Sequence, residues 1–388
     1  MLPTLFTFSK LIWNDCLNKP KKNGSLQQHM DAAQEWLKRA QDQGNDDGVS
    51  YGYSIKGGWL DSYRETSGYI ATTFFNLAEQ QPDSDYFERA VRICRWLLSV
   101  QNADGSFANP RYGSDGIVFD TGQDLFGLVR AFEKTADPAF KEGAARAAAW
   151  LIRVADESGI WSRFEHLNTA HVYNSRTAWA LLRMRQITSD ENFKTDLEKI
   201  ARANLDWALA EQQANGFFNH CAFSLGKAPF THTIAYTACG LLESGQLLQD
   251  QRYITAARRC ANAALQLLKK NGFLTGQITV SGDAAAHYCC LTGNCQFAII
   301  WAKLFQQTGD TTYQQAAIAA LDYVMGCQDI TTDNRHIHGA IKGSQPIWGR
   351  YSPLSFPNWP SKFFVDAMLL RMSWLPKESS LSRSGNPE

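Results

Sequence analysis

Six short clusters of polar residues recur along the sequence about sixty residues apart, and each directly precedes an apolar stretch. They contain carboxyl, amide, imidazole and cationic side chains and are centred on Glu65, Asp120, Asn174, His232, Asn294 and Asn358. Carboxyl and imidazole groups are common proton donors and acceptors in enzymes. The sequence therefore predicts acid–base chemistry, if the fold brings the clusters to one place.

Two kinds of acid–base chemistry fit these residue types. Hydrolysis of a glycosidic bond uses two carboxyl groups roughly 5–10 Å apart, and the candidates are Asp61, Glu65, Asp120, Asp124 and Asp283. Lyase or epimerase chemistry on a uronic acid uses His, Tyr or Lys with a cation over the sugar carboxylate. Its candidates are His171, Tyr173, Arg176, His232, Tyr236 and His287, with Lys342, Arg350 and Lys362 as cations. The repeated pairing of cations with His and Tyr favours an acidic sugar, and both chemistries stay open.

The densest polar cluster is His171-Val172-Tyr173-Asn174-Ser175-Arg176. In a functional interpretation, His171 or Tyr173 transfers a proton and Arg176 neutralises a substrate carboxylate through a bidentate contact. In a structural interpretation, the same groups form a satisfied network within a loop.

Helix capping is the structural alternative for several other members of the clusters. The side chains of Asp120, Asn174 and Asn294 are of the types that satisfy the free N–H groups of a first helical turn. Caps rarely use His or Arg, so His232 and Arg176 are harder to explain in this way.

The clusters open six helices that are apolar on more than one face, as is typical of helices packed on both sides. Each of the first five is followed by a short turn and a helix that is apolar on one face only. The missing sixth partner, with the same one-sided pattern, lies at residues 25–43. If it packs beside the last helix, six helical hairpins close into a ring, an all-α (α/α)6 toroid. We predict one toroid domain over residues 25–375, an N-terminal arm (1–24) and a disordered polar tail (376–388).

The connections between helices are short on one face of this toroid and long on the other. The long ones all lead into the polar clusters and cover residues 44–63, 101–119, 156–173, 213–231, 271–290 and 329–357. Long loops are commonly functional, and helix N-termini favour anions, so this face is predicted to carry the mouth of a bowl. The predicted catalytic residues are Glu65, Asp120, His171, Tyr173, Arg176 and His232. The predicted substrate-binding residues, whose tryptophans would stack on sugars, are Trp59, Asp61, Arg64, Gln123, Asn174, Asn294, Lys342, Trp348, Trp359 and Lys362.

Composition argues against several classes of protein. The 38 basic and 38 acidic residues give a formal net charge of zero, which argues against a nucleic-acid binder that relies on a positive field. No apolar run reaches the roughly 18 residues of a membrane helix, and the N-terminal segment lacks the order of a secretory signal. Nine cysteines without a disulfide-framework spacing favour a cytoplasmic location. His287, Cys289, Cys290 and Cys295 are of zinc-ligand type, yet no C-x-x-C pair occurs, so no metal or other cofactor is predicted.

The hairpin pattern resembles the six-hairpin superfamily of carbohydrate-active enzymes, which includes glycoside hydrolases, polysaccharide lyases and sugar epimerases. Residues 339–344, 346–349, 357–359 and 362–364 are most similar to VpsJ-type proteins of bacterial exopolysaccharide biosynthesis. The resemblance implies a hydrolase or lyase that cleaves or modifies a bacterial polysaccharide or its precursor, with an oligosaccharide or polysaccharide as partner. A sugar epimerase and a non-catalytic glycan-binding or exopolysaccharide assembly protein are alternatives on the same fold.

A second likeness points to another class of toroid. Residues 101–107, QNADGSF, are similar to the Q-x-x-x-G-x-W/F turn of squalene cyclases and protein prenyltransferases. The D-x-D-D acidic cluster of the cyclases is absent, and a prenyl- or terpenoid-handling toroid needs an apolar bowl, which the polar clusters argue against. We interpret Asp104-Gly105 as the turn that ends an outer helix.

Overall fold

The computed structural model describes residues 2–17, 23–111 and 113–374, so the predicted tail at 376–388 lies outside the described residues. The inner helices are α3 (Arg64–Gln80), α5 (Val118–Thr135), α7 (Ser175–Ile187), α9 (Thr231–Leu248), α11 (Leu291–Thr308) and α13 (Asn358–Met372). The outer helices are α2 (Leu26–Gln41), α4 (Tyr86–Val100), α6 (Pro138–Val154), α8 (Glu191–Ala210), α10 (Gln251–Leu267) and α12 (Thr311–Cys327).

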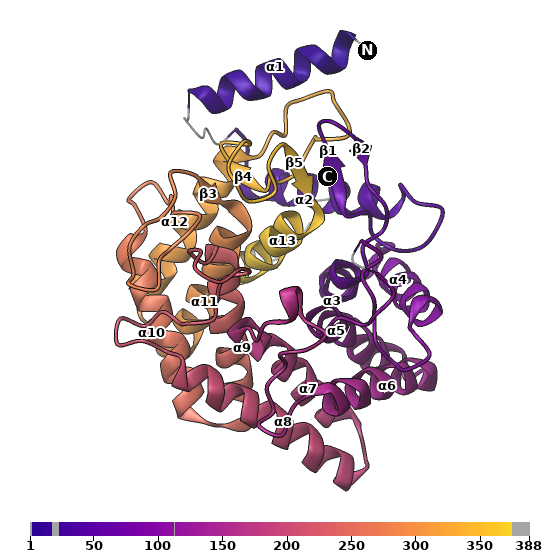
Figure 1. Cartoon of the computed structure of the whole chain (residues 1–388). Helices are drawn as coiled ribbons and strands as arrows, with labels where there is room; N and C mark the ends of the chain where they lie inside the picture. Colours follow the sequence, from indigo (N-terminus) through magenta and orange to yellow (C-terminus); the bar gives the residue numbers. More distant parts are fainter. Residues whose placement is uncertain (1, 18–22, 112, 375–388) are drawn as a thin grey trace, which may run out of the picture.

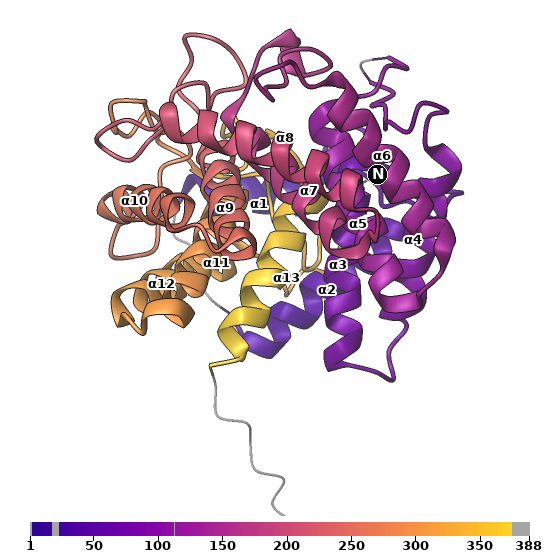
Figure 2. The ribbon, with the colours of Figure 1, turned by 90° about the horizontal axis from the view of Figure 1, so that it is seen from below.

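The inner helices form a closed ring. Each contacts the next along the chain, and α13 contacts α3 and so joins the two ends (Figure 1). The outer helix α2 has no inner helix before it and packs against α13, as Figure 2 shows. The predicted all-α (α/α)6 toroid is therefore confirmed, including its closure by the N-terminal outer helix.

Glycines let neighbouring inner helices approach closely near the ends that carry the polar clusters. A Cβ atom on Gly68 of α3 would lie 2.5 Å from the Cα atom of Asp124 in α5. A Cβ atom on Gly293 of α11 would lie 2.9 Å from the backbone N atom of His232 in α9. Because only glycine fits at such distances, these residues hold the beginnings of the inner helices, and the polar groups beside them, close together.

Inner and outer helices differ in how they are capped. Most outer helices begin at a residue whose own side chain accepts a first-turn N–H, namely Ser25, Asp137, Asp190, Asp250 and Asp310. In the described structure, no inner helix has such a bond from its N-cap residue. The interpretation of Asp120, Asn174 and Asn294 as caps is therefore wrong. Their side chains are used for other contacts.

The segment that resembles the cyclase turn has a structural role. Helix α4 ends at Val100, and Nε2 of Gln101 donates hydrogen bonds of 2.9 Å to the carbonyl groups of Gly105 and Gly143. Gln212 makes the equivalent pair of bonds at the end of α8, to Gly216 and Ala256. The motif is thus a repeated device that ties an outer helix to the next hairpin, which confirms its interpretation as a turn.

Short strands join the first and last loops of the mouth face. β1 (Gly52–Ser54) pairs antiparallel with β2 (Gly58–Trp59) on one side and with β5 (Ser355–Pro357) on the other. A second pair, β3 (Cys289–Cys290) and β4 (Ser344–Gln345), links the loops before α11 and α13. None of the helices in the described ranges is long and apolar enough to cross a membrane.

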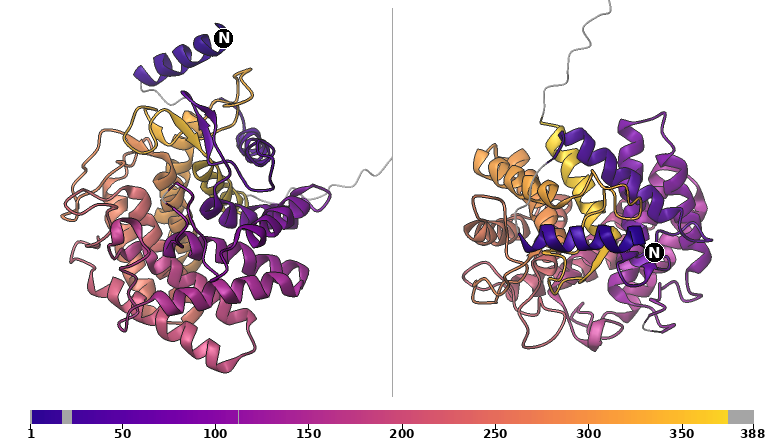
Figure 3. Two further views of the ribbon diagram at one scale, coloured as in Figure 1. Left: turned by 45° about the vertical axis from the view of Figure 1, so that its right-hand side comes forward. Right: turned by 90° about the horizontal axis from the view of Figure 1, so that it is seen from above.

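The predicted N-terminal arm contains a helix, α1 (Leu2–Cys16), which lies outside the ring (Figure 1 and Figure 3). Asp15 near its end is buried. It accepts hydrogen bonds from Nζ of Lys342 over 2.6 Å and from the backbone N–H of Ile347 over 2.7 Å. Lys342 therefore binds Asp15 of α1, and its predicted role as a substrate-binding cation is corrected.

Candidate active site

A cavity of about 600 Å³ opens at the face where the inner helices begin. Its wall is built by the first turns of α3, α5, α9 and α13, by the loops before them and by the loop before α7. The carboxyl groups in this wall belong to Glu65, Asp115, Asp120 and Glu165. Its aromatic side chains include Tyr51, Tyr63, Tyr69, Phe119, Tyr173, Tyr236, Tyr351 and Trp359. The cavity thus combines proton-transfer groups with ring faces of the kind that stack on sugars.

Tyr63 and Asn109 form a polar bridge between two of these carboxyl groups. The hydroxyl group of Tyr63 donates to Oε2 of Glu65 over 2.5 Å, and Nδ2 of Asn109 donates to the Tyr63 hydroxyl over 3.0 Å. The Asn109 amide also lies close enough to Asp120 to lower the pKa of that carboxyl group. Since Glu65 begins α3 and Asp120 lies in the first turn of α5, the bridge spans two neighbouring inner helices.

Another carboxyl group of the wall, the buried Glu165, comes from the loop before α7 and is absent from the sequence-based prediction. Its Oε1 atom accepts a hydrogen bond of 2.9 Å from the backbone N–H of Phe119, beside Asp120. Its Oε2 atom accepts a second hydrogen bond, of 3.4 Å, from the backbone N–H of His166. Glu165 therefore caps the beginning of α5 from another loop. The Oδ1 atom of Asn174 accepts a hydrogen bond of 3.1 Å from the Thr177 hydroxyl group instead of capping α7.

Burial strongly changes how these carboxyl groups titrate. It raises the pKa of Glu65 to about 7, although the hydrogen bond from Tyr63 and the charge of Arg176 oppose the rise. It raises the pKa of Glu165 to about 8. Burial also raises the pKa of Asp120 well above its usual range, and the nearby carboxyl groups of Glu65 and Glu165 add to this rise. The cavity therefore holds protonated carboxyl groups near neutral pH, as general acid catalysis requires.

His232, a predicted catalytic residue, also lines the cavity. Its Nδ1 atom donates to Oε1 of Gln296 over 2.9 Å, and its ring centroid lies 4.3 Å from that of Tyr236. Burial lowers the pKa of His232 to about 3. The imidazole is consequently neutral at ordinary pH, with Nε2 left as its lone-pair nitrogen.

Arg176 lies behind the cavity wall, not in it. Its Nε atom donates to Oε1 of Gln123 over 2.6 Å. Its guanidinium carbon lies 5.9 Å from the ring centroid of Tyr69 and 5.0 Å from that of Tyr236, and both rings line the cavity. The predicted bidentate contact of Arg176 with a substrate carboxylate is therefore wrong, because Arg176 makes cation–π contacts with these rings from beneath the cavity. Gln123, a predicted binding residue, instead holds Arg176 in place.

Lys362 is in a similar position. It is buried, its Nζ atom donates to Oδ2 of Asp366 over 2.5 Å, and it lies 5.1 Å from the ring centroid of Tyr69. The structure thus places this predicted substrate-binding cation beneath the cavity, where its charge is paired.

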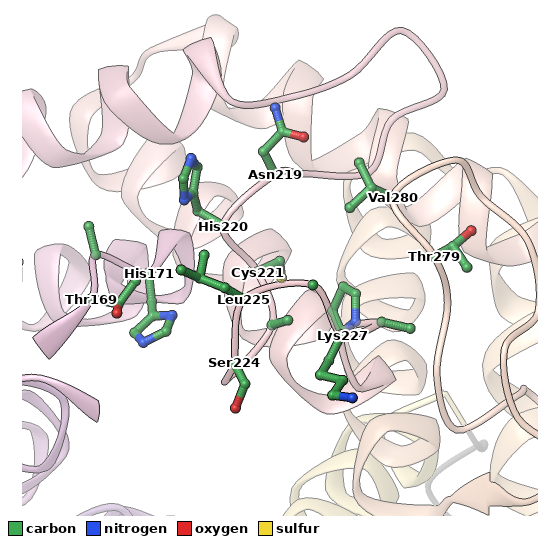
Figure 4. A pocket seen from close by; sticks show the side chains of 15 residues that line it. Thr169, His171, Asn219, His220, Cys221, Ser224, Leu225, Lys227, Thr279 and Val280 are labelled. Carbon is green, nitrogen blue, oxygen red and sulfur yellow. The ribbon is translucent and has the colours of Figure 1, made fainter. Parts of the chain in front are cut away.

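His171 lines a second groove instead of the cavity. This groove of about 480 Å³ lies between the loops before α7, α9 and α11, and Figure 4 shows its side chains. Nε2 of His171 donates to the carbonyl group of His166 over 3.1 Å, and its ring stacks on Tyr173 with centroids 4.6 Å apart. Tyr173 does line the cavity. The predicted position of His171 in the bowl is therefore wrong. His171 packs against the side of Tyr173 that faces away from the cavity.

Trp359 is the one predicted tryptophan in the cavity wall, where its Nε1 atom donates to the hydroxyl group of Tyr351 over 2.8 Å. Trp59 lies outside the cavity and stacks on Trp36, with ring centroids 5.4 Å apart. Trp348 is 45% exposed on a mouth loop. Trp59 and Trp348 therefore belong to the rim and not to the bowl.

Two further predicted binding residues also lie outside the cavity. Arg64 donates from Nη1 to the carbonyl group of Ala108 over 3.0 Å, which ties α3 to the next loop. Asp61 is exposed and does not line the cavity. Their predicted positions in the bowl are corrected accordingly.

Asn294 has a structural role that makes a clear prediction. Its Nδ2 atom donates hydrogen bonds of 3.0 Å to the carbonyl groups of Gly272 and Ala320, and all three groups are buried. Asn294→Leu is expected to lower the free energy of unfolding by about 2–4 kcal/mol, because two buried carbonyl groups lose their donor. Denaturant unfolding measures this loss. A raised KM at unchanged stability would instead restore the predicted binding role.

Loop residues are what sequence reasoning missed. Glu165, Asn109, Tyr63 and Tyr351 line the cavity, and all four lie in loops where no periodicity marks an inward side chain. One signal existed for Glu165, because an α5 without a capping residue of its own needs an acceptor from elsewhere.

No group of three or more His, Cys, Asp and Glu side chains within the described ranges is arranged to hold a metal ion. The cysteines that are of zinc-ligand type, Cys289, Cys290 and Cys295, are buried in the core. All nine cysteines are free thiols.

Comparison with known proteins agrees with the fold. No protein-family model matches the chain, and no curated protein sequence is significantly similar to it. Solved structures do match. An unsaturated glucuronyl hydrolase from Bacillus sp. GL1, described as responsible for the degradation of glycosaminoglycan, has a TM-score of 0.68 at 15% identity over 89% of this chain and 96% of that one. An unsaturated glucuronyl hydrolase specific for heparin has a TM-score of 0.70 at 13% identity, over 90% and 97%. A D-mannose isomerase has a TM-score of 0.68 at 12% identity, over 90% and 97%. The chain therefore has the (α/α)6 toroid fold of these sugar enzymes, and their activities do not follow from identities this low.

Proposed function

We propose that this protein is a carbohydrate-active enzyme of the glycoside hydrolase type, acting on an oligosaccharide from a bacterial polysaccharide or its precursor. The observation that carries the proposal is a set of three mutually interacting carboxyl groups in one aromatic-lined cavity, the buried Asp120 and Glu165 and the half-buried Glu65. Glycosidic hydrolysis needs this combination of a protonated carboxyl group and a second one that ionises near neutral pH.

The reaction proposed is an acid–base cleavage. A protonated carboxyl group gives its proton to the glycosidic oxygen as the bond from that oxygen to the anomeric carbon breaks. A carboxylate assists the attack of water at the anomeric carbon and takes a proton from that water. The pair of carboxyl groups therefore gives one proton and gains one proton in each turnover. Tyrosine and Trp359 side chains in the wall offer ring faces to the sugar.

The likeness to unsaturated glucuronyl hydrolases supports a uronic-acid-containing oligosaccharide, and Arg350 in the cavity wall offers a cation for such a sugar. The similarity of residues 339–364 to VpsJ-type proteins supports an exopolysaccharide or its precursor as substrate. Nine free thiols support a reducing, cytoplasmic compartment. Residues 25–375 are proposed as the catalytic unit, with the 1–24 arm as an accessory to it.

A sugar epimerase or isomerase is the second candidate. The observation that favours it is the neutral imidazole of His232 beside Tyr236 in the cavity wall, a pair able to accept and return a proton. A prenyl- or terpenoid-handling function fits poorly with a cavity that carries four carboxyl groups.

Product analysis tests the proposal. Uronate-containing and neutral oligosaccharides are incubated with the protein, and reducing ends, ultraviolet absorbance of unsaturated uronates and NMR spectra of the products are followed. We expect new reducing ends that disappear in the Glu65→Gln variant. Rising absorbance would instead indicate a lyase, and an altered sugar without cleavage an epimerase. Retained glycan binding with no reaction would favour an assembly protein and contradict the hydrolase proposal.

A further inference from the structure

The two carboxyl groups at the ends of the Tyr63–Asn109 bridge have unequal surroundings. Glu65 receives the Tyr63 hydroxyl at 2.5 Å, a length typical of an O–H donor to an ionised carboxylate. For Asp120, the neutral amide of Asn109 is the nearby group that favours ionisation, and its Oδ2 atom accepts no hydrogen bond from the described part of the chain. The bridge thus stabilises negative charge at one end more than at the other.

The charges around the bridge act in the same direction. The titratable groups that interact with Glu65 from the surrounding elements are Tyr63, Tyr69, Asp120, Asp124, Glu165, Tyr173, Arg176 and Tyr236. Arg176, the one cation in this set, favours ionised Glu65. Asp120 instead faces the three carboxyl groups of Glu65, Asp124 and Glu165, each of which disfavours its ionisation.

We infer that Tyr63 is a positioning residue that makes Glu65 the ionised member of the pair and leaves the proton on Asp120. This inference rests on the proposed function and assigns the roles within it. Glu65 acts as the carboxylate that takes a proton from water or attacks the sugar, and Asp120 acts as the acid that gives its proton to the leaving oxygen. Tyr63 itself touches Glu65 and Asn109 and does not have to touch the reacting bond.

The packing of Tyr63 makes the test clean. Its ring contacts Tyr51 and Trp359, with centroids 5.1 Å and 6.4 Å away, and phenylalanine keeps both contacts. Tyr63→Phe therefore removes only the hydroxyl group from the bridge. Tyr351→Phe is the matched control, because it also removes a hydroxyl from the cavity wall. This hydroxyl accepts from Trp359 and makes no hydrogen bond to a carboxyl group of the described residues.

Two readouts are compared in the full-length protein. NMR of protein labelled at its carboxyl carbons measures the pKa of Glu65 without substrate. The acid limb of the pH profile of kcat/KM reports the same pKa during turnover. In Tyr63→Phe both are expected to move upward by about one pH unit or more, because a carboxylate loses a charge-assisted donor. Tyr351→Phe is expected to leave the titration of Glu65 unchanged.

The outcomes separate the inference from the proposed function. An unchanged titration of Glu65 in Tyr63→Phe overturns the inference, whether or not the protein cleaves sugars. A shifted titration in a protein that cleaves no sugar keeps the charge assignment and contradicts the hydrolase proposal. A shifted titration with a lower kcat but an unmoved acid limb would show that Glu65 is not the base, and would overturn the assignment of roles.

Discussion

Asp120→Asn is expected to lower kcat by about 10²–10⁴-fold, the range over which a positioned general acid acts. Asp120 lines the cavity, is 5% exposed and lies beside the Glu165 carboxyl group at the beginning of α5. Asparagine has nearly the same shape, so the Asn109 contact and the fold are kept while the transferable proton is removed. Steady-state kinetics on the cleaved oligosaccharide measures the loss, with KM close to that of the unmodified protein.

Asp61→Asn is the matched control, because Asp61 is a carboxylate on the same face that is exposed and lies outside the cavity. It is expected to keep full activity. Equal losses in both variants would mean that charge at the mouth, and not a proton on Asp120, matters. Full activity of Asp120→Asn would remove Asp120 from the mechanism.

Glu165→Gln is expected to make the protein more stable at alkaline pH while lowering its activity. Glutamine keeps an acceptor for the Phe119 N–H and carries no titratable proton. In the unmodified protein, burial raises the pKa of Glu165 from 4.5 to about 8. The unfolded chain then releases this proton from about pH 4.5 while the folded protein keeps it, so stability falls as pH rises through this window.

The size of this effect follows from the pKa difference of Glu165. Full loss of its contribution by about pH 9 corresponds to about 5 kcal/mol, as an order of magnitude. Denaturant unfolding between pH 5 and pH 9 is expected to show a flatter profile for Glu165→Gln, with the two proteins alike near pH 5. Glu157→Gln, an exposed residue on the same loop, is the control and should follow the unmodified protein. Parallel profiles for Glu165→Gln and the unmodified protein would show that Glu165 is ionised at little cost in the folded state.

The architecture could be predicted because it depends on local sequence patterns. The predicted outer helix at 25–43 matches α2 at Leu26–Gln41, and its packing against α13 confirms the closure. Helical periodicity, Asp residues before outer helices and the alternation of short and long loops are all properties of neighbouring residues. They needed no knowledge of long-range contacts.

The candidate site could be predicted only in part, because depth within the bowl is a tertiary property. Glu65, Asp120 and His232 were predicted from their positions at helix beginnings, and all three line the cavity. Arg176 occupies a comparable place in the sequence, yet the rings of Tyr69 and Tyr236 cover it. Whether a residue of a polar cluster faces the cavity or lies beneath it depends on side chains from other helices.

Contacts between distant loops explain the remaining differences. Asn294 and Lys342 look like free binding groups in the sequence, but their partners, Gly272, Ala320 and Asp15, bind them in the fold. Glu165 approaches α5 from more than forty residues away in the sequence. No local sequence pattern predicts such partners.

A structure of the Asp120→Asn protein with a soaked oligosaccharide is the most direct measurement. We expect the sugar in the cavity between Glu65, Asp120→Asn and Glu165, with a glycosidic oxygen within hydrogen-bonding distance of the substituted side chain and a ring stacked on a tyrosine or on Trp359. A sugar bound only on the rim at Trp59 or in the groove beside His171, with the cavity empty, would contradict the proposed active site.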